Sequence, residues 1–248
     1  MNVKHDVEIV GVQSVLLIED SIRFYSSYLP NMYKIVFKQS LEFMTEGLNE
    51  HQRMLRMRGR PKILLATNYE DAEELYTKYR NNLLGIISDI RYKRGGKQDP
   101  QAGIKFCKMV QENDPYMPIL LQSSEPENAS IAKELNVGFL SKNSKTLTLE
   151  LRNYLTKHLA FGEFIFRDPN TLEEITRAAN LQELQQKILK IPDSSLAYHI
   201  ARNDFSKWLN ARALFPIAQM FKPVRPDDFE NLDAIRKYIY EEISKYRI

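Results

Sequence analysis

The chain has 248 residues, of which 43% are hydrophobic and 27% are charged, a composition typical of globular proteins. Its net charge of +3 is too small to indicate a nucleic-acid partner, and one cysteine excludes an internal disulfide. No apolar run reaches the roughly 20 residues that span a bilayer, and the polar start is not a secretory signal. We therefore expect a cytoplasmic protein with no membrane partner.

Strand-like and helix-like segments alternate from residue 14 to 160. Short β-rich runs recur at 14–19, 62–67, 83–88, 118–123 and 137–141. Helical periodicity fills the gaps at 70–81, 102–112, 126–135 and 145–160. Because parallel strands need crossovers, the alternation predicts an α/β fold whose parallel sheet has helices on both faces. We expect this domain to cover 14–160 and to follow an N-terminal linker, 1–13.

The insertion between the first two strands, 21–61, is far longer than the dozen residues that a simple crossover needs. Its pattern predicts helix throughout, with an interruption at Pro30. Two interpretations stay open. It is either an elongated helix that covers the second domain, or a dimerisation or docking arm, for which Met44, Leu48 and Met54 would supply adaptable apolar contacts.

The segment 161–248 has a different character and is predicted to be a mostly helical connector or output region. A short strand is expected at 161–166, and turn residues at 168–170 allow a hairpin. Short helices are expected at 180–190, 193–201, 203–213, 215–221 and 228–246. Positive charge is mixed with acids, so no recognition helix for DNA stands out.

Two groups of residues in this segment have both a structural and a functional interpretation. A small core is the favoured reading, ahead of a ligand groove, for seven side chains: Trp208, Leu209, Leu214, Phe215, Ile217, Met220 and Phe221. His199 and Asp204 suggest catalysis, but a partly buried or capping pair is the plainer interpretation.

Polar side chains follow four of the predicted strands. The first strand runs into Glu19 and Asp20, the second apolar run after the insertion ends at Asp89, and the last two end at Ser123 and Lys142. An isolated acid after a strand is commonly a helix cap or a loop residue. Ligands of open parallel sheets bind beyond the carboxyl ends of the strands, so the four tips together indicate one site.

Neighbouring carboxylates repel one another unless a cation lies between them. Mg2+ prefers oxygen ligands, so Asp20 and Asp89 are expected to bind it directly and Glu19 through water, with the backbone carbonyl of Arg91 as a further ligand. Asp89 could then attack phosphorus as a nucleophile.

The other two strand tips suit the same chemistry. Lys142 would pair with the transferred phosphoryl oxygens, and Ser123 would donate its hydroxyl to one of them.

These motifs resemble the receiver domain of two-component response regulators, and the matching residues are LIEDS at 17–21, IISD at 86–89, LQSS at 121–124 and FLSK at 139–142. The resemblance implies a five-stranded flavodoxin-like sheet of order 2-1-3-4-5. It makes Asp89 the phosphoacceptor from a histidine kinase or another phosphodonor. Phe139 falls at the position of the aromatic switch residue, which acts with Ser123.

Three features depart from that family. Asn143 replaces the proline that usually follows the lysine, so no cis Lys–Pro peptide is expected. The loop 90–97 is longer and more basic than usual and lacks a Met-Pro pair. The insertion after Ser21 is atypical as well.

A second resemblance covers most of the chain. Residues 39–50 and 198–209 look like a regulatory segment of large proteins similar to phosphoenolpyruvate synthase or pyruvate phosphate dikinase. It implies a receiver that regulates an attached or partner phosphotransferase domain. ATP-binding and phosphohistidine motifs are not recognisable here, so no turnover activity is expected. The uncapped last helix fits an excised fragment or a frayed natural terminus.

Two rival hypotheses stand beside the signalling module. One is a non-phosphorylated structural domain of a phosphoenolpyruvate synthase-like enzyme, which the intact acids and Lys142 argue against. The other is an aspartate-nucleophile phosphatase. That class needs a second acid two residues after the nucleophile, where this chain has Arg91.

Overall fold

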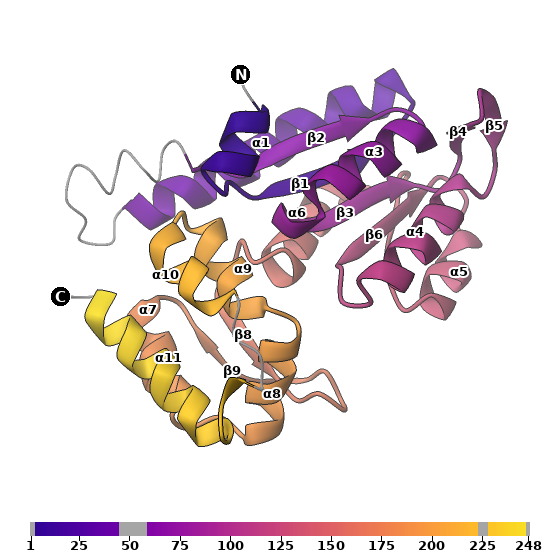
Figure 1. Ribbon diagram of the computed structural model, residues 1–248. Helices are drawn as coiled ribbons and strands as arrows, with labels where there is room; N and C mark the ends of the chain where they lie inside the picture. Colours follow the sequence, from indigo (N-terminus) through magenta and orange to yellow (C-terminus); the bar gives the residue numbers. More distant parts are fainter. Residues whose placement is uncertain (1–2, 45–58, 223–227, 247–248) are drawn as a thin grey trace. The chain divides into compact units, whose positions relative to one another are not determined.

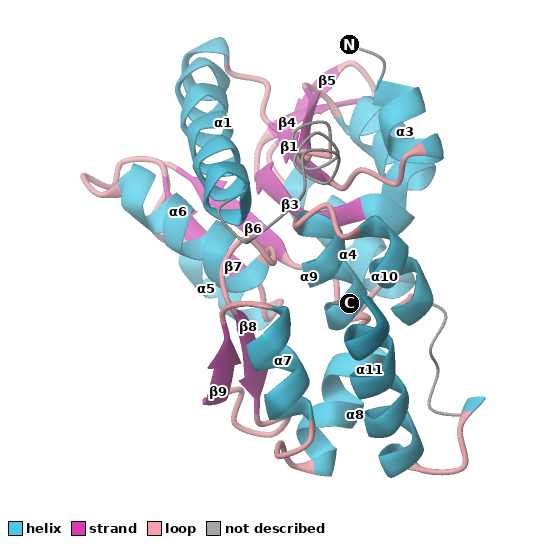
Figure 2. Cartoon of the chain, turned by 90° about the vertical axis from the view of Figure 1, so that its left-hand side faces the viewer, coloured by secondary structure: helices cyan, strands magenta, loops and turns pink. Residues whose placement is uncertain are grey.

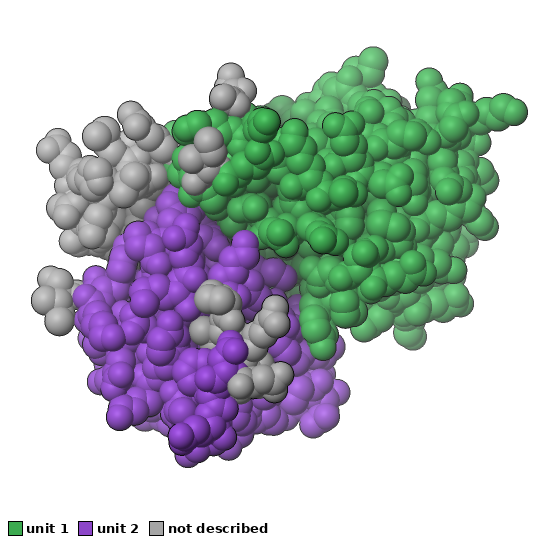
Figure 3. Space-filling view, in the orientation of Figure 1, with its two compact units in different colours: residues 1–159 green, residues 160–248 purple. Residues whose placement is uncertain are grey.

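The computed structural model describes residues 3–44, 59–222 and 228–246. It divides into two units, Met1–Leu159 and Ala160–Ile248 (Figure 3). Each unit has its own hydrophobic core. The predicted arm residues Leu48 and Met54 lie outside the described residues.

Five parallel strands form the main sheet of the first unit (Figure 1). The strands are β1 (Ser14–Ile18), β2 (Lys62–Ala66), β3 (Leu83–Asp89), β6 (Ile119–Ser123) and β7 (Gly138–Ser141). Their order is β2-β1-β3-β6-β7, which is 2-1-3-4-5 when only these five are numbered. Every residue of β1 and β3 is buried, because helices cover both faces of the sheet. The predicted flavodoxin-like α/β fold is confirmed.

The described part of this unit contains the α-helices α1 (Ile22–Met44), α3 (Tyr69–Tyr79), α4 (Ala102–Asn113), α5 (Asn128–Glu134) and α6 (Leu147–His158), and a short 3-10 turn, η2, at Arg80–Asn82. Helices α1 and α6 pack together on one side of the sheet, and α3 and α4 on the other (Figure 2). The side chain of Asn68 caps α3 by accepting a hydrogen bond from the backbone N–H of Asp71.

Helix α1 passes through Pro30 without a break, so the predicted interruption is wrong. Proline removes a backbone donor and crowds the preceding turn. The missing donor is the one that would bond to the carbonyl of Ser26, while the next carbonyl, that of Ser27, accepts from Nδ2 of Asn31 at 3.0 Å. Tyr28, Met32 and Val36 recur every four residues and are buried. This apolar stripe holds the helix on the sheet whatever the local cost of the proline.

The segment before β1, which we predicted as a linker, packs on the first unit over its described residues. It forms one π-helical turn, η1 (His5–Ile9), in which Val7 is buried. Asp6 forms an ion pair with Lys62 of β2 at 3.0 Å. Both contacts join this segment to the sheet edge.

The loop after Asp89 contains a hairpin that the sequence pattern did not predict, formed by β4 (Tyr92–Arg94) and β5 (Lys97–Asp99). Its turn is Gly95–Gly96, with φ of +60° and +76°, values that favour glycine. Tyr92 anchors the base of the hairpin in the core. The backbone N–H of Gly95 donates to Glu70 at 2.8 Å and so fixes the tip.

Over its described residues, the second unit combines the hairpin β8 (Phe164–Arg167) and β9 (Glu174–Ala178) with five α-helices. These are α7 (Leu181–Ile188), α8 (Asp193–Ala201), α9 (Asp204–Ala211), α10 (Phe215–Phe221) and α11 (Leu232–Tyr246). Six of the seven predicted core side chains are buried. Met220 is the exception, because it lies on the exposed side of α10.

Candidate functional site

The register of the sheet brings the predicted polar tips together. Ile18 pairs with Ser88 across β1 and β3, so Glu19 follows level with Asp89. Asp89 in turn pairs with Gln122 of β6. Each strand therefore ends at the same edge of the sheet, as the parallel arrangement requires.

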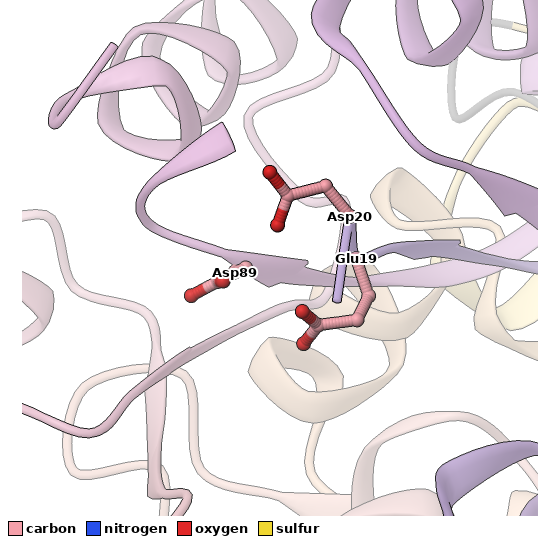
Figure 4. A group of neighbouring side chains, drawn as sticks. All are labelled: Glu19, Asp20 and Asp89. Carbon is pink, nitrogen blue, oxygen red and sulfur yellow. The ribbon is translucent and has the colours of Figure 1, made fainter. Parts of the chain in front are cut away.

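Three carboxyl groups gather beyond the ends of β1 and β3 (Figure 4). One oxygen from each of Glu19, Asp20 and Asp89 lies within 4.8 Å of the others. Glu19 is fully buried, Asp89 is 8% exposed and Asp20 is half-buried. The set contains only hard oxygen donors at the spacing of a shared ligand sphere, so these residues fit a divalent cation such as Mg2+.

Lys142 supplies the positive charge of the site. Its Nζ lies 2.6 Å from Oε2 of Glu19 and 2.7 Å from Oδ2 of Asp89, and its side chain is almost entirely buried. The ammonium also stands over the ring of Phe24, 4.3 Å from its centroid. Phe24 belongs to the first turn of α1, so the atypical insertion starts at the site.

The pKa values of the two buried acids are raised. The pKa of Glu19 is raised to about 7, first by burial and then by the charge of Asp89, while Lys142 and the Ser21 backbone N–H oppose the rise. Burial likewise raises the pKa of Asp89, although Lys142 and the backbone N–H of Ile90 oppose this. Desolvation outweighs the ion pair because both carboxyls are withdrawn from water.

Two further donors orient Glu19. The buried amide of Gln122 donates to Oε2 at 3.2 Å, and the backbone N–H of Ser21 donates to Oε1 at 3.1 Å. Gln122 was not among the site residues that the sequence motifs predicted. The available signal was an amide inside an otherwise apolar, fully buried strand, where a polar side chain needs a partner.

The backbone around Asp89 is closely packed. Ile90 N–H donates to Oδ1 of Asp89 at 2.8 Å, and the Ser88 hydroxyl donates to the Asp89 carbonyl at 2.7 Å. A Cβ on Gly103 would stand 2.1 Å from that same carbonyl oxygen. Only glycine therefore lets the start of α4 lie this close to Asp89, where Gly103 N–H donates to the carbonyl of Ile90 at 2.9 Å.

Ser123 is held as an acceptor. Its Oγ accepts from Asn128 Nδ2 at 2.9 Å and from the Glu125 backbone N–H at 3.0 Å. A hydroxyl has two acceptor positions and one hydrogen, so these bonds leave the hydrogen for donation. The Lys142 N–H donates to the Ser123 carbonyl at 2.8 Å, which ties the two tips together. The predicted switch residue Phe139 is half-buried against the core.

The predicted carbonyl ligand of Arg91 also lies at this edge. Gln98 of β5 extends its Nε2 to that carbonyl and to Oδ2 of Asp20, each at 3.3 Å. One amide thus joins two of the predicted cation ligands. The sequence did not point to Gln98, since the hairpin that carries it was not predicted.

Asn143, which stands where the resembled family has proline, makes a specific contact. Its Nδ2 donates to the carbonyl of Ser124 at 3.1 Å, linking the ends of β6 and β7. As expected, no cis peptide bond occurs within the described parts of the chain.

His199 and Asp204 of the second unit form a structural pair. Nδ1 of His199 lies 2.8 Å from Oδ2 of Asp204, and Nε2 accepts from the backbone N–H of Arg167 at 3.1 Å. Both ring nitrogens are thus engaged, and the ring is buried against Phe164 and Phe205. The plainer of our two interpretations is the one that this geometry supports.

None of the helices in the described residues is both long and apolar enough to cross a bilayer. Comparison with family models and with curated proteins finds no match.

Solved structures give several likenesses. A response regulator receiver domain protein from Clostridium thermocellum is 16% identical, with a TM-score of 0.40, over 59% of this chain and 94% of that one. The Vibrio cholerae chemotaxis protein CheY4 is 20% identical, with a TM-score of 0.38, over 58% and 99%. Full-length FixJ from B. japonicum is 13% identical, with a TM-score of 0.39, over 94% and 98%. The fold of this chain is established by its own sheet order and helix placement.

Proposed function

We propose that this chain is a receiver module of a phosphorelay, in which Asp89 accepts a phosphoryl group. The observation that carries this proposal is the environment of Asp89. Its carboxylate is paired with Lys142 at 2.7 Å and lies within 4.8 Å of oxygens from Glu19 and Asp20. An ordinary helix cap or loop acid needs neither a buried lysine nor two further carboxylates.

The reaction is a phosphoryl transfer from a phosphohistidine of a histidine kinase or from a small acyl phosphate. A carboxylate oxygen of Asp89 attacks the phosphorus, and the bond from phosphorus to the donor atom breaks. The donor leaves with the electron pair, and Asp89 becomes an acyl phosphate. This chemistry is mostly positioning and charge stabilisation, which a buried, hydrogen-bonded aspartate supplies.

A divalent cation would neutralise charge between the phosphoryl group and the acids. Asp20, Asp89 and the Arg91 carbonyl would hold it, with Glu19 acting through water. Lys142 would pair with a phosphoryl oxygen on the other side. Ser123 would donate its free hydroxyl hydrogen to a second phosphoryl oxygen. Phe139 would act as the switch residue, changing its side-chain position when Ser123 makes this bond.

The helical unit, 160–248, and the long α1 are the candidates for output. Following the resemblance found in the sequence, we propose that the module regulates an attached or partner phosphotransferase domain similar to those of phosphoenolpyruvate synthases. Dimerisation through the insertion 21–61 belongs to the same proposal. The module itself would carry out no steady turnover.

The experiment is covalent adduct formation with acetyl phosphate in the presence of Mg2+, followed by intact mass and peptide mapping. We expect one adduct, located on Asp89 and dependent on Mg2+. Asp89→Asn should abolish it. Asp114→Asn, at the far end of α4, is the matched control and should react like the wild-type chain.

Two results would contradict the proposal. If the wild-type chain forms no adduct and shows no Mg2+-dependent change, the site is structural, as in the rival non-phosphorylated domain. If the donor is hydrolysed steadily without an accumulating adduct, the chain is a phosphatase.

A further inference from the structure

We infer that Gln98 is an additional residue of the cation site, whose side-chain amide oxygen helps to hold the divalent ion. This inference rests on the proposed function, because it assumes that the acidic cluster binds a cation. It adds a residue from the β4–β5 hairpin, a part of the chain that the receiver motifs do not include.

The position of the amide is the main observation. Gln98 Nε2 stands between two oxygens, Oδ2 of Asp20 and the carbonyl of Arg91, at 3.3 Å from each. Both oxygens belong to the proposed ligand set. Two electron-rich oxygens that converge on one point need a positive partner, and the amide hydrogens fill that role in the structure as it stands.

The Gln98 amide can rotate so that its oxygen and nitrogen exchange positions. Hydrogen bonds of 3.3 Å are long for an N–H donor and an oxygen acceptor, so breaking them costs little free energy. A cation at Asp20 and Arg91 would repel the amide hydrogens. Turning the amide by half a turn puts the oxygen of Gln98 in the same place, where it can face the ion or accept from a bound water.

The hairpin presents Gln98 from a fixed frame. Tyr92 is buried at its base, and Gly95 is bonded to Glu70 at its tip. Asp99, the next residue after Gln98, pairs with Lys105 of α4 at 2.7 Å. The side chain therefore extends from an anchored strand, so the backbone that carries it needs no further ordering when an ion binds.

The test is a titration with Mn2+ alone, in which the free ion is counted by electron paramagnetic resonance. Gln98→Ala should weaken binding by about tenfold, the scale expected for a residue that supports the ligands of a metal. Gln98→Glu should tighten binding, because it places a carboxylate where the amide oxygen would be. Gln101→Ala is the matched control, since Gln101 is an exposed glutamine of the same connection, and it should bind like the wild type.

The outcomes separate this inference from the proposed function. If the wild-type chain binds Mn2+, Asp20→Asn loses binding and Gln98→Ala binds as tightly as wild type or more tightly, the role of Gln98 is refuted and the cation site stands. If the wild-type chain binds no Mn2+, both the role of Gln98 and the proposed cation site are refuted. Gln98 is exposed, and circular dichroism of each variant checks that the fold is kept.

Discussion

Replacing Glu19 with glutamine should stabilise the first unit at pH 8 and remove most of its pH dependence. Burial raises the pKa of Glu19 from 4.5 to about 7. Between these values the folded chain holds a proton that the unfolded chain releases. The stabilisation is therefore complete below pH 4.5 and is lost as the pH rises through 7.

The magnitude follows from the same two values. A difference from 4.5 to about 7 corresponds to about 3 kcal/mol of unfolding free energy. The raised pKa of Asp89 acts in the same direction, so a smaller slope should persist in Glu19→Gln. Because small domains are only marginally stable, a decrease of this size in unfolding free energy would be clearly measurable.

The assay is urea unfolding followed by far-ultraviolet circular dichroism, in EDTA, at pH 5, 6, 7 and 8. Glu150→Gln serves as the control, because hydrogen bonds from Ser144 and Thr146 lower the pKa of Glu150 and its contribution has the opposite sign. The reasoning is refuted if wild-type stability rises from pH 5 to 8, or if Glu19→Gln keeps the full wild-type slope.

Three other substitutions test separate parts of the structure. Lys142→Met should destabilise the cation-free chain by about 3–5 kcal/mol, because it leaves Glu19 and Asp89 without a cationic partner. Mg2+ should restore much of the lost stability, and urea unfolding with and without Mg2+ measures the loss and the recovery. Gly103→Ala should lower the unfolding free energy by about 1–3 kcal/mol, measured by thermal unfolding, and should slow adduct formation on Asp89, measured by mass spectrometry. An unchanged melting temperature would contradict the close packing of Gly103 on Asp89. His199→Ala should lower the stability of the second unit, monitored by Trp208 fluorescence, and leave the Asp89 adduct unchanged, whereas loss of the adduct would contradict its structural role.

The sheet and most of the site could be predicted because their signals are local. A buried parallel strand is a short apolar run, and the residue after it lies at the ligand-binding edge. Glu19, Asp89 and Lys142 follow such runs directly, so their meeting depends only on the strand order. A local rule failed at Pro30, where the buried stripe of α1 outweighs the lost backbone hydrogen bond.

The unpredicted parts depend on contacts between distant residues. The Gly95–Gly96 pair is a turn signal in the loop 90–97, but the strands on either side are short and mostly charged, and the hairpin is anchored by the buried Tyr92 and by Glu70 on a separate helix. Gln122 likewise acquires its role only through Glu19, which lies 103 residues earlier. Periodicity describes one element at a time, so it cannot show which polar group a neighbouring element will satisfy.

The start of α1 is part of the acidic site, and this changes how the insertion should be understood. Phe24 covers the ammonium of Lys142, and one turn later the Tyr28 hydroxyl is buried with no hydrogen-bond partner among the described residues. Burial, and then the charges of Glu19 and Asp89, raise the pKa of Tyr28, which places its ring in the field of the same acids. A buried hydroxyl without a partner costs about 1–3 kcal/mol. Substitutions in these first turns will therefore act on Lys142 and the acids directly, whatever the remainder of the helix contacts.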